Sequence, residues 1–444
     1  MTGFFHAYDL RGKYPEQISE KEAEKVGKAY GTFTDAEKVL VGRDGRKHAE
    51  KITESFIEGI TSTGTDVVNV GVAPSPVVYF GMVENSIESA AVVTASHNPS
   101  EYTGFKFCKE NALAMSRDGG MKKIEEIYAE ERFETGEGKT ETLDLKQTYI
   151  EFVKDNISLE KDDLDIVINF GNGVATVLGR ELFEELGCNV KTVNEELDGD
   201  FPNHLPAPGN EEAQKQLEAE MTDEDLGIIF DGDGDRAGFI LPGYGYISED
   251  EVLAVFSKEC LESSKGTVIY DLRASKLVPE IIEKYGVKPS TARVGHTFIS
   301  EEIHSDPSIV FAGELSGHYY FPGFNVPWDD GLFSAALMCQ IVSEQDLAEL
   351  LNSFEDYPVS PELRLDCPHS SKQPVIDKLK KEYSDHKLST VDGVKIHFDK
   401  GWALIRPSNT EEKMSVRCEA DSQEDVDRLL KQVRGDVERL IENS

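Results

Sequence analysis

The chain has 444 residues, of which 39% are hydrophobic, and its 84 acidic residues against 46 Lys and Arg give a formal net charge of −38. This acidity excludes nucleic-acid binding, which requires a basic footprint, and docking on an anionic membrane surface. The acidic residues are spread along the chain, which is typical of a solvated, halophile-like surface, although any strongly acidic cytosolic enzyme has the same pattern. The length predicts roughly two to four domains.

The six cysteines are far apart and include no CxxC pair, so we expect buried thiols in a reducing compartment. The N-terminus lacks the apolar run of a signal peptide, and no stretch of about 18 apolar residues predicts a membrane span. We therefore expect a cytoplasmic protein with no membrane contact. The sequence leaves the oligomeric state, monomer or dimer, open.

The first predicted domain, residues 1–150, opens with the segment YDLRG and then alternates strands and helices. The pattern predicts a helix with Ser19 as its N-cap, followed by further strands and helices; these elements fall at 19–30, 38–41, 50–63 and 66–70. The acidic, turn-rich stretch 129–144 is interpreted as a surface excursion before a helix over 145–156. Alternating strands and helices are typical of a layered α/β domain.

A serine lies where the apolar run 90–94 of this domain enters a polar turn. Ser96 is followed directly by His97, and Lys106 lies ten residues further on, so an acid or base is close in sequence. A strand that ends in such a loop presents a nucleophile at the edge of a sheet. An ordinary serine-rich turn has the same composition, so this stretch alone leaves both interpretations open.

The second predicted domain, residues 151–250, contains three carboxylates at alternate positions directly after an apolar strand. In the segment DGDGDR, Asp231, Asp233 and Asp235 share one face of an extended loop and can converge on one hard cation. An EF-hand is excluded, because Arg236 and Pro242 stand where that loop needs glycine and glutamate. The pattern favours a Mg²⁺ site over a solvated acidic turn.

The third predicted domain, residues 251–357, again alternates strands and helices, and an apolar run in it leads into the polar segment GELSGH. Its carboxylate, hydroxyl and imidazole, on Glu314, Ser316 and His318, suit hydrogen bonding to sugar hydroxyls, although each is equally compatible with a structural role. The three segments together predict an internal repeat of about 100 residues. We therefore expect an α/β fold of three similar α/β/α domains with mixed sheets, whose loops line one central cleft.

The last predicted domain, residues 358–444, has a different character and reads as a small α+β domain with an antiparallel sheet. Its segment RPSNT, residues 406–410, groups a guanidinium, two hydroxyls and an amide, which suit a phosphate dianion, and Arg417 follows on the next strand. A structural role for this arginine is the alternative. Together the segments predict a serine that can be phosphorylated, a metal site, a loop that binds phosphate and a loop that binds sugar hydroxyls. This combination indicates phosphoryl transfer to a sugar phosphate.

With these segments in order, the chain resembles the α-D-phosphohexomutase superfamily, and within it the phosphomannomutase/phosphoglucomutase group. The resemblance rests on YDLRG, TASHNP with GFKF, DGDGDR, RVGH with GELSGH, and RPSNTE, which span the whole chain. It implies an intramolecular phosphotransferase that interconverts hexose 1-phosphate and hexose 6-phosphate, of mannose, glucose or both. It also implies a hexose 1,6-bisphosphate intermediate, which acts as activator.

The resemblance assigns roles residue by residue. Ser96 would carry the phosphoryl group and bind Mg²⁺ together with Asp231, Asp233 and Asp235. Lys106, Arg11 and His97 would be catalytic, with Lys106 as the acid/base. The substrate, a small sugar phosphate, would contact Tyr8, Arg236, Arg273, His296, Glu314, Ser316, His318, Arg406, Ser408, Asn409, Thr410 and Arg417.

Two segments depart from the family pattern. Glu412 stands where many relatives have proline, and the first-domain loop GRDGRKHAE lacks the paired serines common after its arginine. The former could alter how the fourth domain closes. Two alternatives remain: a phosphoglucosamine mutase, or a non-catalytic relative that binds sugar phosphates. A serine hydrolase is disfavoured because the chain has no GxSxG elbow.

Overall fold

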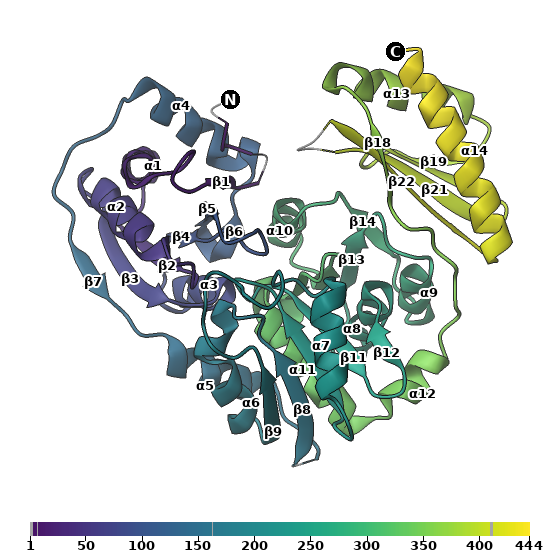
Figure 1. Cartoon of the computed structure of the whole chain (residues 1–444), viewed down its shortest axis with the longest axis horizontal. Helices are drawn as coiled ribbons and strands as arrows, with labels where there is room; N and C mark the ends of the chain where they lie inside the picture. The colour runs from purple at the N-terminus through teal and green to yellow at the C-terminus, as the bar shows by residue number, and fades with distance from the viewer. Residues whose placement is uncertain (1–2, 7, 162, 409–411) are drawn as a thin grey trace.

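The computed structural model describes residues 3–6, 8–161, 163–408 and 412–444, and its four domains follow one another around the molecule (Figure 1). Domains I to III are layered α/β units and domain IV is a smaller α+β unit, so the predicted fold class is confirmed. All six cysteines are buried and free, as expected. Within these ranges, no helix has the length and apolarity needed to cross a membrane.

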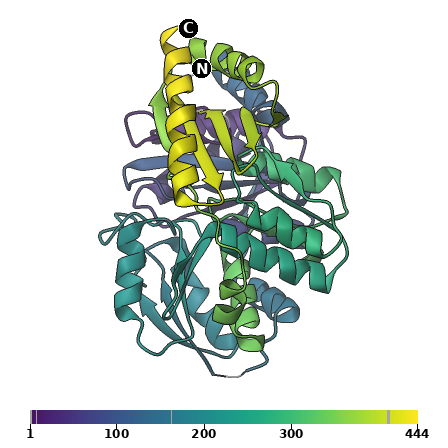
Figure 2. The ribbon, with the colours of Figure 1, turned by 90° about the vertical axis from the view of Figure 1, so that its right-hand side faces the viewer.

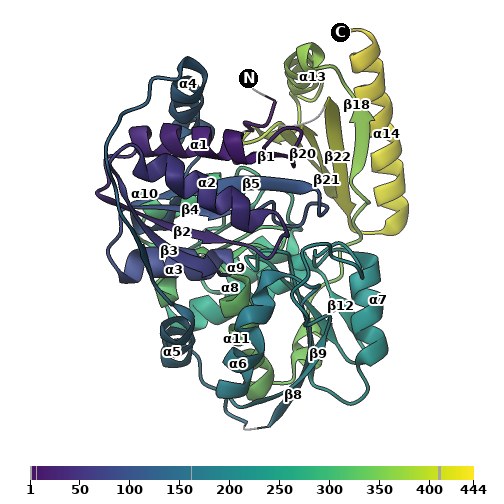
Figure 3. The ribbon, with the colours of Figure 1, turned by 60° about the vertical axis from the view of Figure 1, so that its left-hand side comes forward.

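Domain I is built on a seven-stranded mixed sheet with the order β1-β5-β4-β2-β3-β7 and β6 paired to β5. Its strands are β1 (Leu10–Lys13), β2 (Lys38–Arg43), β3 (Asp66–Val72), β4 (Ser89–Val93), β5 (Tyr102–Lys109), β6 (Leu113–Ala114) and β7 (Thr140–Thr142). Its helices are α1 (Glu20–Phe33), α2 (Ala49–Thr61), α3 (Ser75–Glu84) and α4 (Lys122–Glu130). Helices α1 and α2 cover the outer face of the sheet (Figure 3).

Two local predictions in domain I meet different outcomes. Ser19 caps α1, since its side chain accepts a hydrogen bond from the Glu22 amide, and this confirms the predicted N-cap. The stretch 129–144 is more than a surface excursion, because β7 within it pairs in parallel with β3 at the edge of the sheet. The three residues of β7 are all exposed, so the sequence has no apolar pattern there from which a strand could be predicted.

Domains II and III share one sheet topology. Domain II has β8 (Leu164–Asn169), β9 (Cys188–Val193), β10 (Leu226–Phe230), β11 (Ala237–Leu241) and β12 (Gly245–Ile247), ordered β12-β11-β10-β8-β9. Domain III has β13 (Thr267–Asp271), β14 (Ser290–Ala292), β15 (Ile309–Gly313), β16 (Tyr319–Phe321) and β17 (Val326–Asp329), ordered β17-β16-β15-β13-β14. Their helices are α5 (Lys146–Asn156), α6 (Gly179–Glu185), α7 (Glu211–Glu220), α8 (Glu249–Ser263), α9 (Leu277–Lys284), α10 (His296–Ser305), α11 (Gly331–Glu344) and α12 (Leu347–Asn352).

The repeat brings the three predicted functional loops to equivalent positions. In each of domains I to III, two parallel strand pairs are followed by an antiparallel pair, and the turn within that antiparallel pair is the functional loop. The turns join β4 to β5, β10 to β11, and β15 to β16. Their polar segments are TASHNP, DGDGDR and GELSGH, so the internal repeat predicted from the sequence recurs in the topology.

Domain IV has a five-stranded antiparallel sheet ordered β18-β22-β21-β20-β19. Its elements are β18 (Leu363–Asp366), α13 (His369–Glu382), β19 (Lys387–Ser389), β20 (Val394–Phe398), β21 (Gly401–Pro407), β22 (Lys413–Ala420) and α14 (Gln423–Glu442). Helix α14 lies on the outer face of this sheet (Figure 2).

The hydrophobic cores separate domain IV from the rest. One continuous cluster of buried side chains runs through domains I, II and III, and α11 packs against β10 and β11 of domain II. Domain IV has its own core, and a small separate cluster of Leu272, Trp402 and Leu404 joins it to domain III. The first three domains are therefore held as one packed body, with domain IV attached through this small apolar cluster and through polar contacts such as the ion pair of Lys276 with Asp421.

Candidate active site

Ser96 lies fully buried at the turn between β4 and β5. Its φ of 49° is in the left-handed region, which costs a residue other than glycine about 1–3 kcal/mol and occurs mostly at functional sites. The Thr94 hydroxyl stabilises this conformation by accepting a hydrogen bond from the Ser96 amide at 2.9 Å. The backbone thus directs the serine hydroxyl toward domain II.

An arginine that the sequence analysis did not single out holds this loop. The guanidinium of Arg46 donates hydrogen bonds to four backbone carbonyls of the loop: Ser96 (2.8 Å), Asn98 (2.7 Å), Pro99 (2.7 Å) and Tyr102 (3.2 Å). Asp44 pairs with its Nε at 3.1 Å, and Arg46 is only 2% exposed. Its segment, GRDGR, carries three charged residues, of which Asp44 and Arg46 are buried, but only the fold reveals which carbonyls Arg46 reaches.

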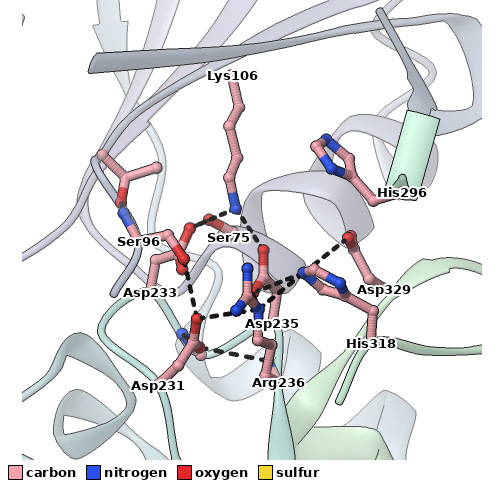
Figure 4. Close-up of polar contacts among 12 residues, drawn as sticks. Ser75, Ser96, Lys106, Asp231, Asp233, Asp235, Arg236, His296, His318 and Asp329 are labelled. Carbon is pink, nitrogen blue, oxygen red and sulfur yellow. Dashed lines mark hydrogen bonds and ion pairs between the residues drawn. The ribbon is translucent and has the colours of Figure 1, made fainter. Parts of the chain in front are cut away.

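The carboxylates of domain II face the serine across the domain boundary (Figure 4). Ser96 Oγ donates a hydrogen bond to Asp231 Oδ2 at 3.0 Å. Lys106 Nζ, from β5, lies 2.7 Å from Asp233 Oδ2 and also pairs with Asp235 Oδ2. All three aspartates are completely buried. The predicted association of serine, lysine and three aspartates therefore exists in the folded chain.

The charge state of this cluster follows from its neighbours. Burial and the two other carboxylates raise the pKa of Asp231 well above its usual value. Burial opposes ionisation of Asp235 too, but Lys106 and His318 outweigh it and hold the pKa of Asp235 well below its usual value. Burial likewise opposes the charged form of Lys106, but Asp233 and Asp235 overcome it and raise its pKa.

The donor set fits a hard divalent cation. Oxygen atoms of Asp231, Asp233 and Asp235 all lie within 4.8 Å of one another. Oδ1 of Asp233 and of Asp235 are buried without a hydrogen-bond partner, which leaves two carboxylate oxygens available as cation ligands. Carboxylate oxygens are the ligands that Mg²⁺ prefers, and such a site leaves room for phosphate oxygens.

A pocket of about 350 Å³ lies over this cluster and is lined by polar side chains from domains I, II and III. Six residues of the predicted site line it: Tyr8, Arg11, Lys106, Arg236, His296 and His318. Three further lining residues, His6, Asp9 and Asn98, were not predicted, and Asn98 accepts a hydrogen bond from Arg11 at 2.7 Å. Asp9 and Asn98 lie within the motifs YDLRG and TASHNP, which is the signal that could have found them.

The GELSGH loop forms a hydrogen-bond network around one imidazole. His318 Nδ1 lies 3.0 Å from Glu314 Oε2 and 2.9 Å from Ser316 Oγ, while its Nε2 lies 3.0 Å from Arg236 Nε and 3.6 Å from Asp235 Oδ1. Burial and Arg236 disfavour a charged ring, but Asp235 and Glu314 outweigh them and raise the pKa of His318 to about 9. Contacts on both ring nitrogens thus fix the orientation of this imidazole at the pocket.

Two other histidines are neutral. Burial and His318 lower the pKa of His296 to about 4. His97 Nδ1 lies 3.3 Å from Ser96 Oγ, but the charge of Arg236 together with burial lowers the pKa of His97 to about 2. A ring with so low a pKa can hydrogen-bond the serine, but it is a weak general base near neutral pH.

Of the predicted phosphate-binding residues of domain IV, the three that the structure describes, Arg406, Ser408 and Arg417, do not line the pocket described above. Arg406 Nε pairs with Asp392 at 2.7 Å, and Asp392 also accepts the Val294 amide at 3.4 Å. Arg417 pairs with Asp250, near the start of α8, at 3.0 Å. The Ser408 amide donates to Lys413 O, and the predicted residues Asn409 and Thr410 lie outside the described residues.

Other parts of the predicted site also have structural partners. Arg273 pairs with Asp271, whose carboxylate also accepts the Leu315 amide at 3.0 Å and so ties Arg273 to the GELSGH loop. Glu412, which replaces a common proline, accepts a hydrogen bond from the His369 amide at 3.2 Å. Since His369 is the first residue of α13, this carboxylate stabilises the helix N-terminus.

Two buried polar residues of the site were missed in the sequence. Ser75, at the start of α3, donates from its hydroxyl to Asp233 Oδ2 at 2.7 Å. Asp329, at the end of β17, lies 3.9 Å from His318 Nε2 (Figure 4). Burial and Asp235 raise the pKa of Asp329 to about 6. Both stand in segments whose apolar pattern indicates only core strands and helices.

The sequence matches the four domain profiles described as phosphoglucomutase/phosphomannomutase alpha/beta/alpha domain I (residues 3–135), domain II (147–243), domain III (248–357) and C-terminal domain (362–435). A phosphomannomutase/phosphoglucomutase of Pseudomonas aeruginosa is 32% identical over 438 residues, covering 96% of this chain and 94% of that protein.

The similarity extends to further relatives and to solved structures. A protein of Methanopyrus kandleri named probable phosphoglucosamine mutase is 32% identical, covering 100% of this chain and 99% of that protein. The crystal structure of a phosphoglucomutase/phosphomannomutase family protein from Burkholderia thailandensis superposes with a TM-score of 0.91 at 31% identity, covering 99% of this chain and 98% of that one. Four domain matches in chain order, full-length relatives and a common fold confirm the resemblance, and the chain belongs to the phosphoglucomutase/phosphomannomutase family.

Proposed function

We propose that this protein is a phosphohexomutase that interconverts hexose 1-phosphate and hexose 6-phosphate through a phosphoserine at Ser96. The observation that carries the proposal is the position of Ser96 Oγ, 3.0 Å from Asp231, beside two further buried carboxylates and beneath a pocket lined by arginine, lysine and histidine. Full-length relatives named phosphomannomutase/phosphoglucomutase support the same activity.

The carboxylate cluster is the proposed Mg²⁺ site. Asp231, Asp233 and Asp235 would hold the ion together with an oxygen of phosphorylated Ser96. Bound there, Mg²⁺ would neutralise the carboxylates and polarise the phosphoryl oxygens. A phosphoserine dianion with three carboxylates carries about five negative charges against two on the ion, so Lys106, Arg11 and Arg236 are needed nearby.

In the transfer step, the bond from phosphorus to Ser96 Oγ breaks and a bond forms to the free hydroxyl oxygen of the hexose phosphate. The bisphosphate then turns over in the pocket and returns its other phosphoryl group to Ser96 Oγ, which leaves the isomeric monophosphate. Lys106 is the proposed acid/base. Asp233 and Asp235 hold Lys106 protonated, so it would have to release that proton to solvent before it could accept the hydroxyl proton, and it would return a proton to Ser96 or the sugar in the reverse transfer.

Substrate recognition is proposed to involve groups from three domains. His318, held by Glu314, Ser316 and Arg236, and His296 line the pocket where the sugar would lie. Glu314 and Ser316 are proposed to read the sugar hydroxyls, and Tyr8, Arg236 and Arg273 to contact the substrate. The phosphate distal to the reaction is assigned to Arg406, Ser408, Asn409, Thr410 and Arg417, which requires domain IV to approach the pocket.

The experiment is a mutase assay with Mg²⁺ and trace glucose 1,6-bisphosphate as activator. Ser96→Ala is expected to abolish turnover and to remove the phosphopeptide that carries residue 96, while sugar-phosphate binding persists. Ser100→Ala, in the same loop, is the matched control and is expected to stay active. Turnover that survives in Ser96→Ala would contradict the phosphoserine mechanism; binding without turnover in the native enzyme would favour a non-catalytic relative.

The same assay addresses substrate preference. Comparable kcat/KM for mannose 1-phosphate and glucose 1-phosphate is expected of a dual-specificity mutase. The Methanopyrus kandleri relative makes glucosamine 1-phosphate the specific alternative, and a preference for that substrate would select it. We propose that the enzyme works in a reducing cytoplasm, on the basis of six buried free thiols in an acidic chain, and the assay at low and multimolar KCl tests its adaptation to salt.

A further inference from the structure

A second pocket, of about 440 Å³, lies between domains III and IV and shares no lining residue with the pocket over Ser96. Its walls come from the end of β13 and the start of α9 on one side, and from β19, β20 and β21 on the other. Its volume is within the range of small-molecule sites. The proposed phosphohexomutase function gives this pocket no role.

The charge of this pocket is opposite to that of the chain. Four lysines line it: Lys276, Lys387, Lys395 and Lys400. They face two aspartates, Asp399 and Asp421, within a protein whose formal charge is −38. Lys276 is paired with Asp421 at 2.6 Å. Behind the lining, the carboxylates of Glu419, Asp271 and Asp250 act on Lys395. The exposed positive charge of the lining is therefore that of Lys387 and Lys400. Lys400 also reaches Asp425 at 3.5 Å, outside the lining, and its side chain is largely exposed.

Lys395 is the feature that distinguishes this pocket from a group of surface lysines. It is only 7% exposed, and its Nζ donates to the carbonyls of Leu272 at 3.0 Å and Ala274 at 3.4 Å, while lying 3.7 Å from the centre of the Trp402 ring. Two of its donors bind these carbonyls and the ammonium lies over the Trp402 ring, so Lys395 places a fixed positive charge in the pocket wall. Burial lowers the pKa of Lys395 to about 8, and the charged form still prevails at pH 7.

We propose that this pocket binds a small phosphorylated anion, which contacts lysines of both domains. Lysine ammonium groups bind phosphate as point charges, and the hydroxyls of Thr291 and Ser389 line the same pocket as hydrogen-bond donors. The apolar contact that joins the two domains, Leu272 with Trp402, is part of the wall. An anion held here ties domain IV to domain III and so regulates the approach of domain IV to the active-site pocket.

The chain offers its own reporter of binding. It has two tryptophans, and Trp402 lines the pocket whereas Trp328 is buried elsewhere beside Asp330. The test is a fluorescence titration of metal-free protein with inorganic pyrophosphate, in wild type and in Trp328→Phe. We expect a saturable change in both proteins, and an affinity that weakens as KCl is raised.

Charge variants assign the signal to its pocket. The double variant Lys387→Ala/Lys400→Ala removes two exposed lysines of the lining and is expected to weaken binding by about tenfold or more. Lys380→Ala/Lys381→Ala, on α13 outside the lining, is the charge-matched control and should bind as wild type. Arg11→Gln, in the active-site pocket, should retain the response.

Three results would overturn the proposal. These are no saturable change in wild type, an undiminished affinity in Lys387→Ala/Lys400→Ala, and loss of the response in Arg11→Gln, which would place the pyrophosphate in the active site. Lys395→Met is a second check and is expected to abolish the response while the circular-dichroism spectrum stays native. A response that survives in a folded Lys395→Met protein would also refute the site.

Discussion

Lys106 is the only positive charge within 3 Å of the Asp233 carboxylate among the described residues, so its removal gives the sharpest test of the site's electrostatics. At 2.7 Å and an effective dielectric constant of about 20, one such contact is worth about 6 kcal/mol before desolvation is subtracted. Removing one partner of a buried pair costs about 3–5 kcal/mol. Lys106→Met keeps the apolar stem and deletes the charge, so we expect it to destabilise the metal-free protein by that amount.

Mg²⁺ should reverse much of this loss. The ammonium of Lys106 and the metal compete for the same buried carboxylate oxygens, so the ion should stabilise the variant more than the wild type. Ligand at about 100 times its dissociation constant adds about 2.7 kcal/mol. The assay is chemical denaturation with and without Mg²⁺, following the transition of domains I to III.

Lys109→Met, three residues along β5, is the matched control, since its side chain lies outside the cluster and over the Phe33 ring. It should lose little stability and show the wild-type response to Mg²⁺. If Lys106→Met matched this control in metal-free stability and in its Mg²⁺ response, the assignment of the three aspartates as a lysine-neutralised cation site would be refuted.

Three further predictions address the supports of the site. Gly104→Ala should destabilise the protein by about 1–3 kcal/mol, because its Cβ would lie 2.1 Å from Leu10 O and disturb the strand pair that carries Arg11; an unchanged denaturation midpoint would contradict this. Asp392→Asn should raise KM by about tenfold with little change in kcat, since Arg406 loses the carboxylate that orients it; a loss confined to kcat would argue against a binding role. The folded pKa of Lys395, about 8 against 10.5, lies below its unfolded value, so burying this residue costs stability below pH 8 and the cost disappears as pH rises toward 10.5. In urea denaturation, the free energy of unfolding of wild type should therefore gain up to about 3 kcal/mol over that of Lys395→Met between pH 7 and 10. A difference between the two proteins that stays constant with pH would refute this. The charged neighbours of Lys395 are Glu419, Asp271, Asp250 and Arg417.

Much of the fold and the chemistry was predictable from local patterns. Ser19 predicts the start of α1 because a serine side chain can accept a hydrogen bond from a backbone amide that has no partner within the helix. The segments that hold Ser96 and Asp231 follow strands of five buried residues, so their polar groups had to emerge at a sheet edge. These signals are readable because each is set by residues within one turn or one strand.

The missing parts depend on contacts between distant segments. Arg46 lies about fifty residues before the loop that it holds, and Ser75 reaches a carboxylate in another domain. Strand β7 exists because β3 offers it an open edge, and its own sequence carries no strand pattern. No local propensity encodes such partners, since they are chosen by packing.

The sequence by itself determined the chemical inventory of this protein: one serine, three alternate carboxylates, a lysine and a set of phosphate-binding groups on loops between regular elements. Tertiary structure alone decided that β4–β5, β10–β11 and β15–β16 bring three of those loops to equivalent positions in their domains, and that Lys106 is shared between Asp233 and Asp235. It also decided that domains I to III share one core while domain IV is joined to them by a small apolar cluster. The physical reason is that side-chain chemistry is local, whereas burial, which sets charge states and joins domains, is a property of the packed whole.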